Sequence, residues 1–231
     1  AGSQFKVIDV SNPAVPKVLG TGAGYSSWAI AVLGNMALLA SPAPNELGLY
    51  VVDASVPSSP RLVADLPGVV GNMDVAAAGS LAAVTTNDGL QTVDVSDPAL
   101  PGVIGSLAIA GRGVALAGQY AYLRVAVSGN PSHIDLAVVD LRTPSSPRLL
   151  SQVYVSGGDR VEVVGSYAYV TTGSALAIYD VGNPAAPQLR GSITIPNGAV
   201  ELAVAGNTAY VGNLSAVYSV DVSNRASPRI V

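Results

Sequence analysis

Charged side chains are rare in this 231-residue chain, so those that recur at fixed spacing are the first candidates for chemistry. Six aspartates recur at intervals of 44, 41, 46, 40 and 41 residues: Asp9, Asp53, Asp94, Asp140, Asp180 and Asp221. A ring of carboxylates could bind calcium, but calcium needs about six to eight oxygens gathered together. Each copy offers one carboxylate. We therefore interpret the aspartates as turn residues that accept hydrogen bonds from nearby backbone N–H groups.

A second polar group appears when the copies are aligned on a recurring glycine (Gly34, Gly79, Gly118, Gly165 and Gly206). The position six residues before that glycine holds Trp28, Met73, Arg112, Asp159 and Val200, and the next holds Ala29, Asp74, Gly113, Arg160 and Glu201. Two interpretations stay open. Either the charges neutralise one another, or they form a pocket for a small polar ligand or a sugar. The predicted ligand site comprises Trp28, as an apolar or stacking wall, with Asp74, Arg112, Asp159, Arg160 and Glu201.

No catalytic residue, metal site or cofactor is predicted. His133 is the only histidine and lies near Ser132 and Asp135 in sequence, but nearness in sequence does not make a triad. A metal site needs more ligands than this segment supplies. We interpret His133 as a solvated loop residue.

The elements that position these residues are strands arranged in repeats. The stretch "VIDVSNPAVPKVLG" returns five times with small changes, and a proline follows each aspartate by seven residues: Pro16, Pro60, Pro101, Pro147, Pro187 and Pro228. Between these copies lie hairpin patterns such as "AVLGNMALLA", in which the glycine suits a two-residue turn. Each period of about 40 residues thus holds four strands, which we name a, b, c and d. Strands a and b flank the glycine, c ends at the aspartate, and d follows the second proline.

Four-stranded antiparallel units of this length are typical of β-propeller blades, and no segment shows a helical period. The repeated aspartate and proline, preceded by "VID" or "VVD", resemble the LVIVD-repeat family over nearly the whole chain. That resemblance implies a bacterial or archaeal cell-surface propeller and implies no particular activity. We therefore expect an extracellular or cell-surface protein.

The composition excludes several classes of partner. The chain is 49% hydrophobic and 11% charged, with a net charge of −4 and no cysteine. A basic footprint for nucleic acid is lacking, and no apolar run reaches the roughly 18 residues of a membrane helix. The apolar residues are expected to lie between blades that are buried on both faces.

The number of repeats raises a question about completeness. Six c–d units accompany only five a–b hairpins. We predict one propeller domain, residues 1–231, with a half blade at 1–28 and blades at 29–71, 72–111, 112–159, 160–199 and 200–231. A six-blade plan with one incomplete blade is preferred, and a five-bladed ring is the alternative. The sequence may also be a fragment, or another molecule may supply the missing strands.

The predicted function is a non-enzymatic structural or protein-interaction scaffold. Its partners would be other proteins or copies of itself, in a head-to-tail oligomer or filament, since an unfinished sheet favours strand addition. The alternative is a propeller that binds a small ligand or a glycan. A hydrolase or lyase is a third reading, because propellers host such enzymes.

Overall fold

The computed structural model describes residues 4–22, 27–41, 48–69, 74–86, 88–127, 130–158 and 160–231. These residues form strands and turns, and none of them lies in a helix, so the described part holds no helix that could cross a membrane. The chain divides into two compact units, Ala1–Ser106 and Leu107–Val231, which are described separately. The assignment of the whole chain to one domain stays a prediction.

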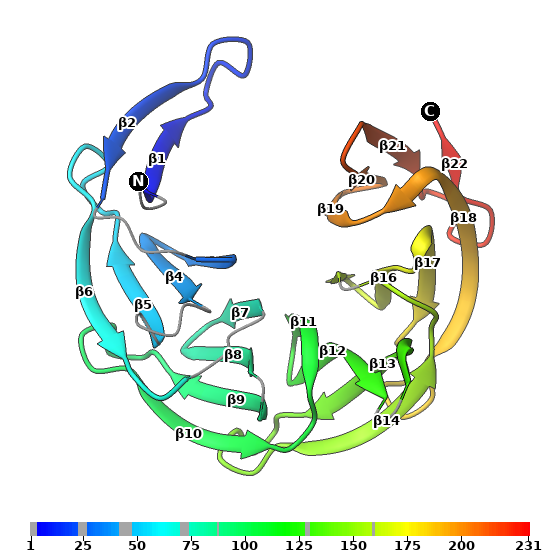
Figure 1. Ribbon diagram of the computed structural model, residues 1–231, viewed down its shortest axis with the longest axis horizontal. Coiled ribbons are helices and arrows are strands. Elements are labelled where there is room, and N and C mark those ends of the chain that lie inside the picture. The colour runs from blue at the N-terminus through cyan, green and yellow to red at the C-terminus, as the bar shows by residue number, and fades with distance from the viewer. Residues whose placement is uncertain are drawn as a thin grey trace. The chain divides into compact units, whose positions relative to one another are not determined.

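Unit 1 contains one two-stranded and two four-stranded sheets, each antiparallel with its strands in sequence order (Figure 1). The two-stranded sheet is β1 (Lys6–Asp9) and β2 (Lys17–Thr21). The first four-stranded sheet comprises β3 (Ala29–Leu33), β4 (Met36–Ser41), β5 (Gly48–Asp53) and β6 (Arg61–Leu66). The second comprises β7 (Asp74–Ala78), β8 (Leu81–Thr86), β9 (Gly89–Asp94) and β10 (Gly102–Leu107).

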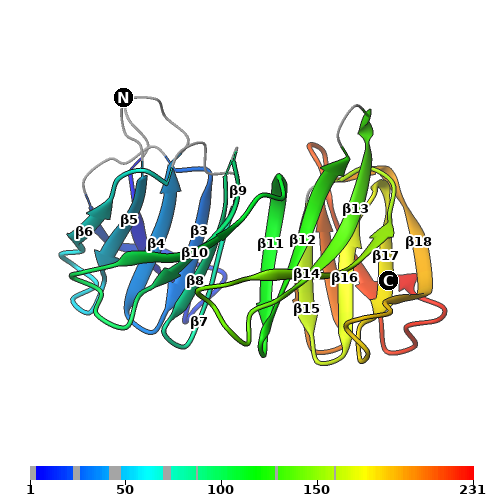
Figure 2. The ribbon, with the colours of Figure 1, turned by 90° about the horizontal axis from the view of Figure 1, so that it is seen from below.

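Unit 2 contains three four-stranded sheets of the same plan (Figure 2). They are β11 (Gly111–Ala117), β12 (Tyr120–Val127), β13 (Asn130–Asp140) and β14 (Arg148–Tyr154); β15 (Val161–Val164), β16 (Tyr167–Thr171), β17 (Gly173–Asp180) and β18 (Gln188–Ala199); and β19 (Glu201–Ala205), β20 (Thr208–Gly212), β21 (Val217–Asp221) and β22 (Arg229–Ile230). Five complete blades and one half blade are therefore confirmed.

Glycine makes the a–b hairpins possible. Gly34, Gly79, Gly118, Gly165 and Gly206 have φ between 59° and 62°. The turns contain two residues with glycine first, which is the form of a type II′ turn. Strands d begin directly after the second proline of each motif, since proline has no N–H to give to a ladder.

The core lies between neighbouring sheets. Strands β4 and β5 are buried on both faces, because one face packs toward the preceding sheet and the other toward the next. In unit 2, Tyr122 of β12 packs with Val161 of β15, and Tyr169 of β16 packs with Leu202 of β19. The tyrosines predicted to pack between blades do so at these two positions.

A second contact joins the turn of one sheet to strand d of the preceding sheet. A Cβ on Gly20 of β2 would lie 2.2 Å from the carbonyl oxygen of Pro57, and one on Gly191 of β18 would lie 2.4 Å from that of Arg225. At the matching position of β14, the Ser151 hydroxyl donates to the Pro184 carbonyl at 2.6 Å. The residue eleven positions after the aspartate is therefore small because the next turn lies against it.

Substitution at this contact gives a test of the repeat plan. Gly191→Ala should lower the free energy of unfolding by about 1–3 kcal/mol, because the new methyl group overlaps backbone that cannot rotate away. Urea denaturation measures the change. The control is Gly102→Ala on β10, where an added Cβ meets nothing within 4 Å. Equal effects of the two substitutions would contradict the assigned contact.

Candidate functional site

The six repeated aspartates form turns. In every copy the carboxylate Oδ1 accepts the backbone N–H two residues later, at 2.8–3.0 Å. This is the geometry of an Asx turn, in which a side chain replaces a backbone acceptor where the strand ladder stops. The carboxylates are therefore engaged with their own turns. In the described part of the chain, no three His, Asp or Glu side chains gather as a metal site would require.

A second hydrogen bond ties each complete turn to its hairpin. The residue after the aspartate donates its N–H to the carbonyl of the residue after the hairpin glycine: Ala54 to Asn35, Val95 to Ser80, Leu141 to Gln119, Val181 to Ser166 and Val222 to Asn207, all at 2.8–2.9 Å. Strands a and b are thus linked to the c–d turn as well as to strand c. This bond fixes the position of one motif relative to the other in all five complete sheets.

Arginines add ion pairs to several turns. Arg61, Arg148 and Arg229, which begin strands d, pair with Asp53, Asp140 and Asp221 of the same motif at 2.9–3.4 Å. These cations were predicted to guard a sheet edge, and the structure gives them this additional partner.

Asp140 also accepts from the Arg142 guanidinium, at 3.0 Å from Nε and 2.5 Å from Nη2. The hydrogen bonds from Arg142 hold the pKa of Asp140 well below its ordinary range. Hydrogen bonds from the N–H and hydroxyl of the following serine lower the pKa of Asp53, Asp94 and Asp221 in the same direction. The turns are thus built around ionised carboxylates.

The pH dependence of stability follows from these shifts. A carboxyl group whose pKa is lower in the folded state stabilises the fold above its unfolded pKa of about 4, and this contribution is lost as the pH falls below that value. Asp140→Asn should therefore be less stable than the wild type at pH 7, and the difference should shrink steadily from about pH 4 downward. Thermal unfolding between pH 7 and pH 2 measures it. Asp65→Asn, at an exposed position of β6, is the control and should show no such convergence.

The predicted ligand-site residues lie in separate settings. Arg160 and Glu201 form a two-pronged ion pair, with Nε to Oε2 at 2.8 Å and Nη2 to Oε1 at 3.0 Å, joining the sheets that begin at β15 and β19. Asp74 accepts the N–H of Val75 at 3.0 Å. Trp28 is exposed and precedes β3, and Arg112 is exposed on β11. Asp159 lies outside the described residues.

The structure corrects one predicted loop. Residues Val127 to Asp135 were expected to form an expanded b–c loop, but Asn130–Asp140 is strand β13 and Val127 pairs with Asn130. The two strands instead extend beyond the rest of the sheet, because their alternating pattern continues. His133 thus lies on a strand, and its side chain is outside the described residues. The other predicted loop, Ser41 to Leu47, lies outside them beyond Ser41.

Sequence reasoning missed one functional cation, Arg124 of β12, whose side chain is fully buried. Its guanidinium donates to the carbonyls of Ser156 at 3.1 Å and Gly157 at 2.7 Å, and reaches Gly158 at 3.3–3.4 Å. Three carbonyls of the loop between β14 and β15 therefore converge on one side chain. The alignment on glycines contains the signal, since Ala40, Thr85, Thr171 and Gly212 occupy this position in the other copies.

The role of Arg124 is testable by stability. Arg124→Met should lower the free energy of unfolding by about 2–4 kcal/mol, because buried carbonyls lose their donor. Arg124→Lys should restore only part of it, since an ammonium cannot reproduce the planar fork. Denaturant titration measures both, with the exposed Arg190→Met as the control. A loss no larger than that of the control would contradict a structural role.

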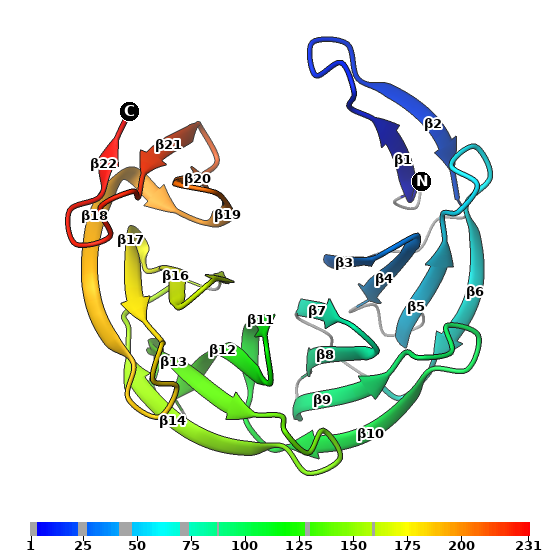
Figure 3. The same ribbon diagram turned by 180° about the vertical axis from the view of Figure 1, so that it is seen from behind.

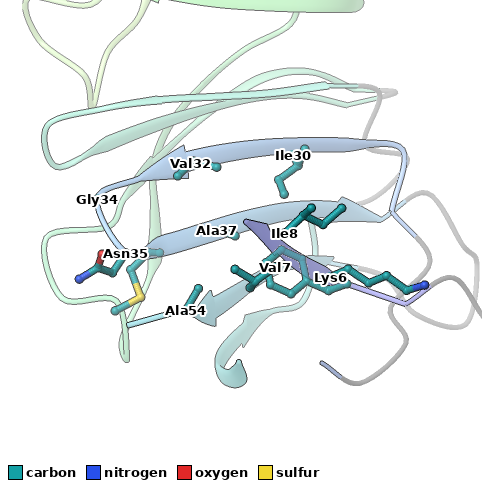
Figure 4. A pocket seen from close by; sticks show the side chains of 11 residues that line it. Lys6, Val7, Ile8, Ile30, Val32, Gly34, Asn35, Ala37 and Ala54 are labelled. Atoms are coloured by element: carbon teal, nitrogen blue, oxygen red, sulfur yellow. The ribbon is translucent and has the colours of Figure 1, made fainter. Parts of the chain in front are cut away.

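The incomplete blade leaves a groove beside the first complete sheet. It has a volume of about 280 Å³ and is lined by residues of β1, β3 and β4, among them Ile8, Ile30, Val32 and Ala37 (Figure 4). We call the surface formed by Ile8, Val10, Ile30 and Val32 the open face. Figure 3 shows β1 beside β3 and β4 within unit 1.

Comparison with known proteins assigns the family. The LVIVD-repeat model matches residues 1–21, 24–66, 71–108, 110–155, 157–195 and 198–231. The chain belongs to the LVIVD-repeat family. The resemblance seen in the repeated aspartate and proline is thereby confirmed, and no curated protein matches the chain.

Solved structures similar to this LVIVD-repeat chain are distant in sequence. A functionally unknown protein from Desulfotomaculum acetoxidans DSM 771 has a TM-score of 0.75 at 17% identity, covering 93% of this chain and 72% of that one. The Swd1 β-propeller domain of Myceliophteria thermophila has a TM-score of 0.69 at 13% identity, covering 93% and 75%. The periplasmic gluconolactonase of Pseudomonas aeruginosa has a TM-score of 0.71 at 12% identity, covering 94% and 73%.

The chain spans 65% of the length of another match, the computationally designed Ika8 protein, at a TM-score of 0.66 and 14% identity. At these identities the likenesses show the β-propeller fold alone.

Proposed function

We propose that this LVIVD-repeat protein is a non-enzymatic interaction scaffold, outside the cell or at its surface, that binds protein through the open face. The cell-surface location rests on the resemblance to the LVIVD-repeat family. The periplasmic location of the P. aeruginosa gluconolactonase is compatible with it.

One comparison among the repeats carries the proposal. Ile30 lies four residues before its hairpin glycine and is 53% exposed, whereas Val75 and Val161 at the same position are 5% and 8% exposed. Val32, two residues before the glycine, is 67% exposed, while Val163 at that position is half-buried. A position that the repeat is built to bury is therefore uncovered, and uncovered apolar surface of this kind marks interaction sites.

The engagement of the charged residues supports a non-enzymatic role. The repeated aspartates are held by their own turns, Arg160 is paired with Glu201, and Arg124 is held by a loop. A general acid, base or nucleophile must be able to reach a substrate, and these groups are engaged in structural contacts.

A second uncovered face makes assembly of copies a specific form of this proposal. Tyr210 of β20 is 43% exposed, whereas Tyr122 and Tyr169 at the same repeat position are buried against the next sheet. The Tyr210 face and the open face are unlike surfaces. A contact between them in two copies would be head-to-tail, which gives rings or filaments.

Self-association tests this proposal. The chain should form concentration-dependent oligomers in light scattering or sedimentation, and Ile30→Glu should weaken the association at least about tenfold, because a charge would be buried in the contact. Leu100→Glu, at a 79% exposed turn position, is the matched control and should associate as the wild type does. A strict monomer at high concentration would exclude assembly through the open face.

The alternative, binding of a small ligand or a glycan at Trp28, Asp74, Arg112, Asp159, Arg160 and Glu201, has a structural obstacle. The Arg160–Glu201 pair satisfies both groups. A polar ligand there would have to open that pair before it gained contacts. We therefore favour the scaffold.

A further inference from the structure

We infer that the open face is the binding site for a two-stranded β-hairpin of the a–b type, presented by another LVIVD-repeat segment. This inference rests on the proposed function and specifies the element that binds. Three features of unit 1 define that element: the free edge of β1, the exposed amide of Val10, and the width of the uncovered surface.

The edge of β1 has the identity of strand c. Like β5 and β9, it ends at the motif aspartate and pairs with strand d, here β2. In the complete sheets, strand c also pairs with strand b on its other edge. Within the described part of the chain, β1 pairs with β2 alone. An unpaired edge is a template for strand addition.

The register of an added strand follows from the other copies. The second residue after the hairpin glycine lies opposite the aspartate in every complete sheet, as Met36 lies opposite Asp53 and Tyr120 opposite Asp140. The same register would place that residue of the incoming hairpin opposite Asp9. It would also bring a carbonyl oxygen to the N–H of Val10.

Val10 is exposed as this register requires. It follows Asp9 directly and is 65% exposed, whereas Val95, Leu141, Val181 and Val222 at the same position are buried. In those copies the residue donates its N–H to the carbonyl after the hairpin glycine. A docked hairpin would supply that carbonyl and cover the Val10 side chain.

The width of the uncovered surface selects a hairpin over a larger element. On the same face of the first complete sheet, Phe5 packs against Tyr50 and Val52 of β5, so the part beside strand c is covered. Ile30 and Val32 of β3 remain exposed. A complete sheet of a second copy could cover Ile30, but it would leave the β1 edge unpaired. Two strands satisfy both the edge and the apolar face.

The side chains of a matching hairpin can be read from the other sheets. The fourth residue after the glycine faces the next sheet, where Tyr122 packs with Val161 and Tyr169 with Leu202. Ala115 and Ala117, on strand a of the same hairpin as Tyr122, lie in that contact too. A hairpin with tyrosine at this position and small residues on strand a should therefore fit over Ile30.

The probe is a cyclised peptide with the sequence of residues 113–123, which holds the Tyr122 hairpin and whose closure supplies the order that an isolated hairpin lacks. Added to the full chain, it should bind saturably and slow hydrogen exchange at the amides of Ile8 and Val10. Alternate amides of a strand point to the same side, and these two point to the free edge. The peptide should also compete with self-association.

Matched substitutions locate the contact. In the peptide, Tyr122→Lys should weaken binding at least about tenfold, while Leu123→Lys on the opposite face should not. In the protein, Ile30→Glu or Val32→Lys should weaken binding to a similar extent, and Leu100→Glu should not. Both protein positions are exposed, so circular dichroism should show an unchanged fold.

The results separate the two proposals. Exchange at Ile8 and Val10 that is unaffected by peptide, or equal binding to wild type and Ile30→Glu, would overturn the hairpin inference. If the chain then still self-associates through Ile30, the scaffold proposal stands without the hairpin. Peptide binding by a strictly monomeric chain would support the hairpin and exclude self-assembly.

Discussion

Burial of both faces of every sheet is the constraint on which the rest of this structure depends. A four-stranded sheet with apolar residues on both sides is stable only if a neighbour covers each face. The repeat meets this need by giving each sheet complementary faces: the position of Tyr122 and Tyr169 packs toward the next sheet, and the position of Val75 and Val161 receives the preceding one. Stability in such an array depends on contacts between adjacent repeats.

The repeated motif keeps these contacts in register. The aspartate holds the c–d turn, the N–H of the following residue binds the hairpin, and the turn lies against a small residue of the preceding strand d. Six copies of one short sequence therefore set three relationships at once. This explains why the motif recurs with so little change although its carboxylates are engaged within their own turns.

The same constraint gives the incomplete blade its importance. Where a hairpin lacks its neighbour, the residues designed for burial become exposed, and the amide that should bind the hairpin points to a free edge. Ile30, Val32 and Val10 are ordinary members of the repeat by sequence, and they differ from their counterparts only in what covers them. Function in this protein is proposed to arise from an interrupted repeat, without a specialised residue.

The sequence by itself determined the strands, the glycine turns, the role of the aspartates in turns and the count of five hairpins against six c–d units. These are local properties, because turn chemistry and alternation act within about ten residues. Only the tertiary structure decided that Arg160 pairs with Glu201, that Arg124 holds the loop at Ser156 to Gly158, and that residues 130–135 continue a strand. Those outcomes depend on groups up to 41 residues apart, whose distances no local pattern specifies. The exposure of Ile30 is also tertiary, since it is set by the neighbour that a position lacks.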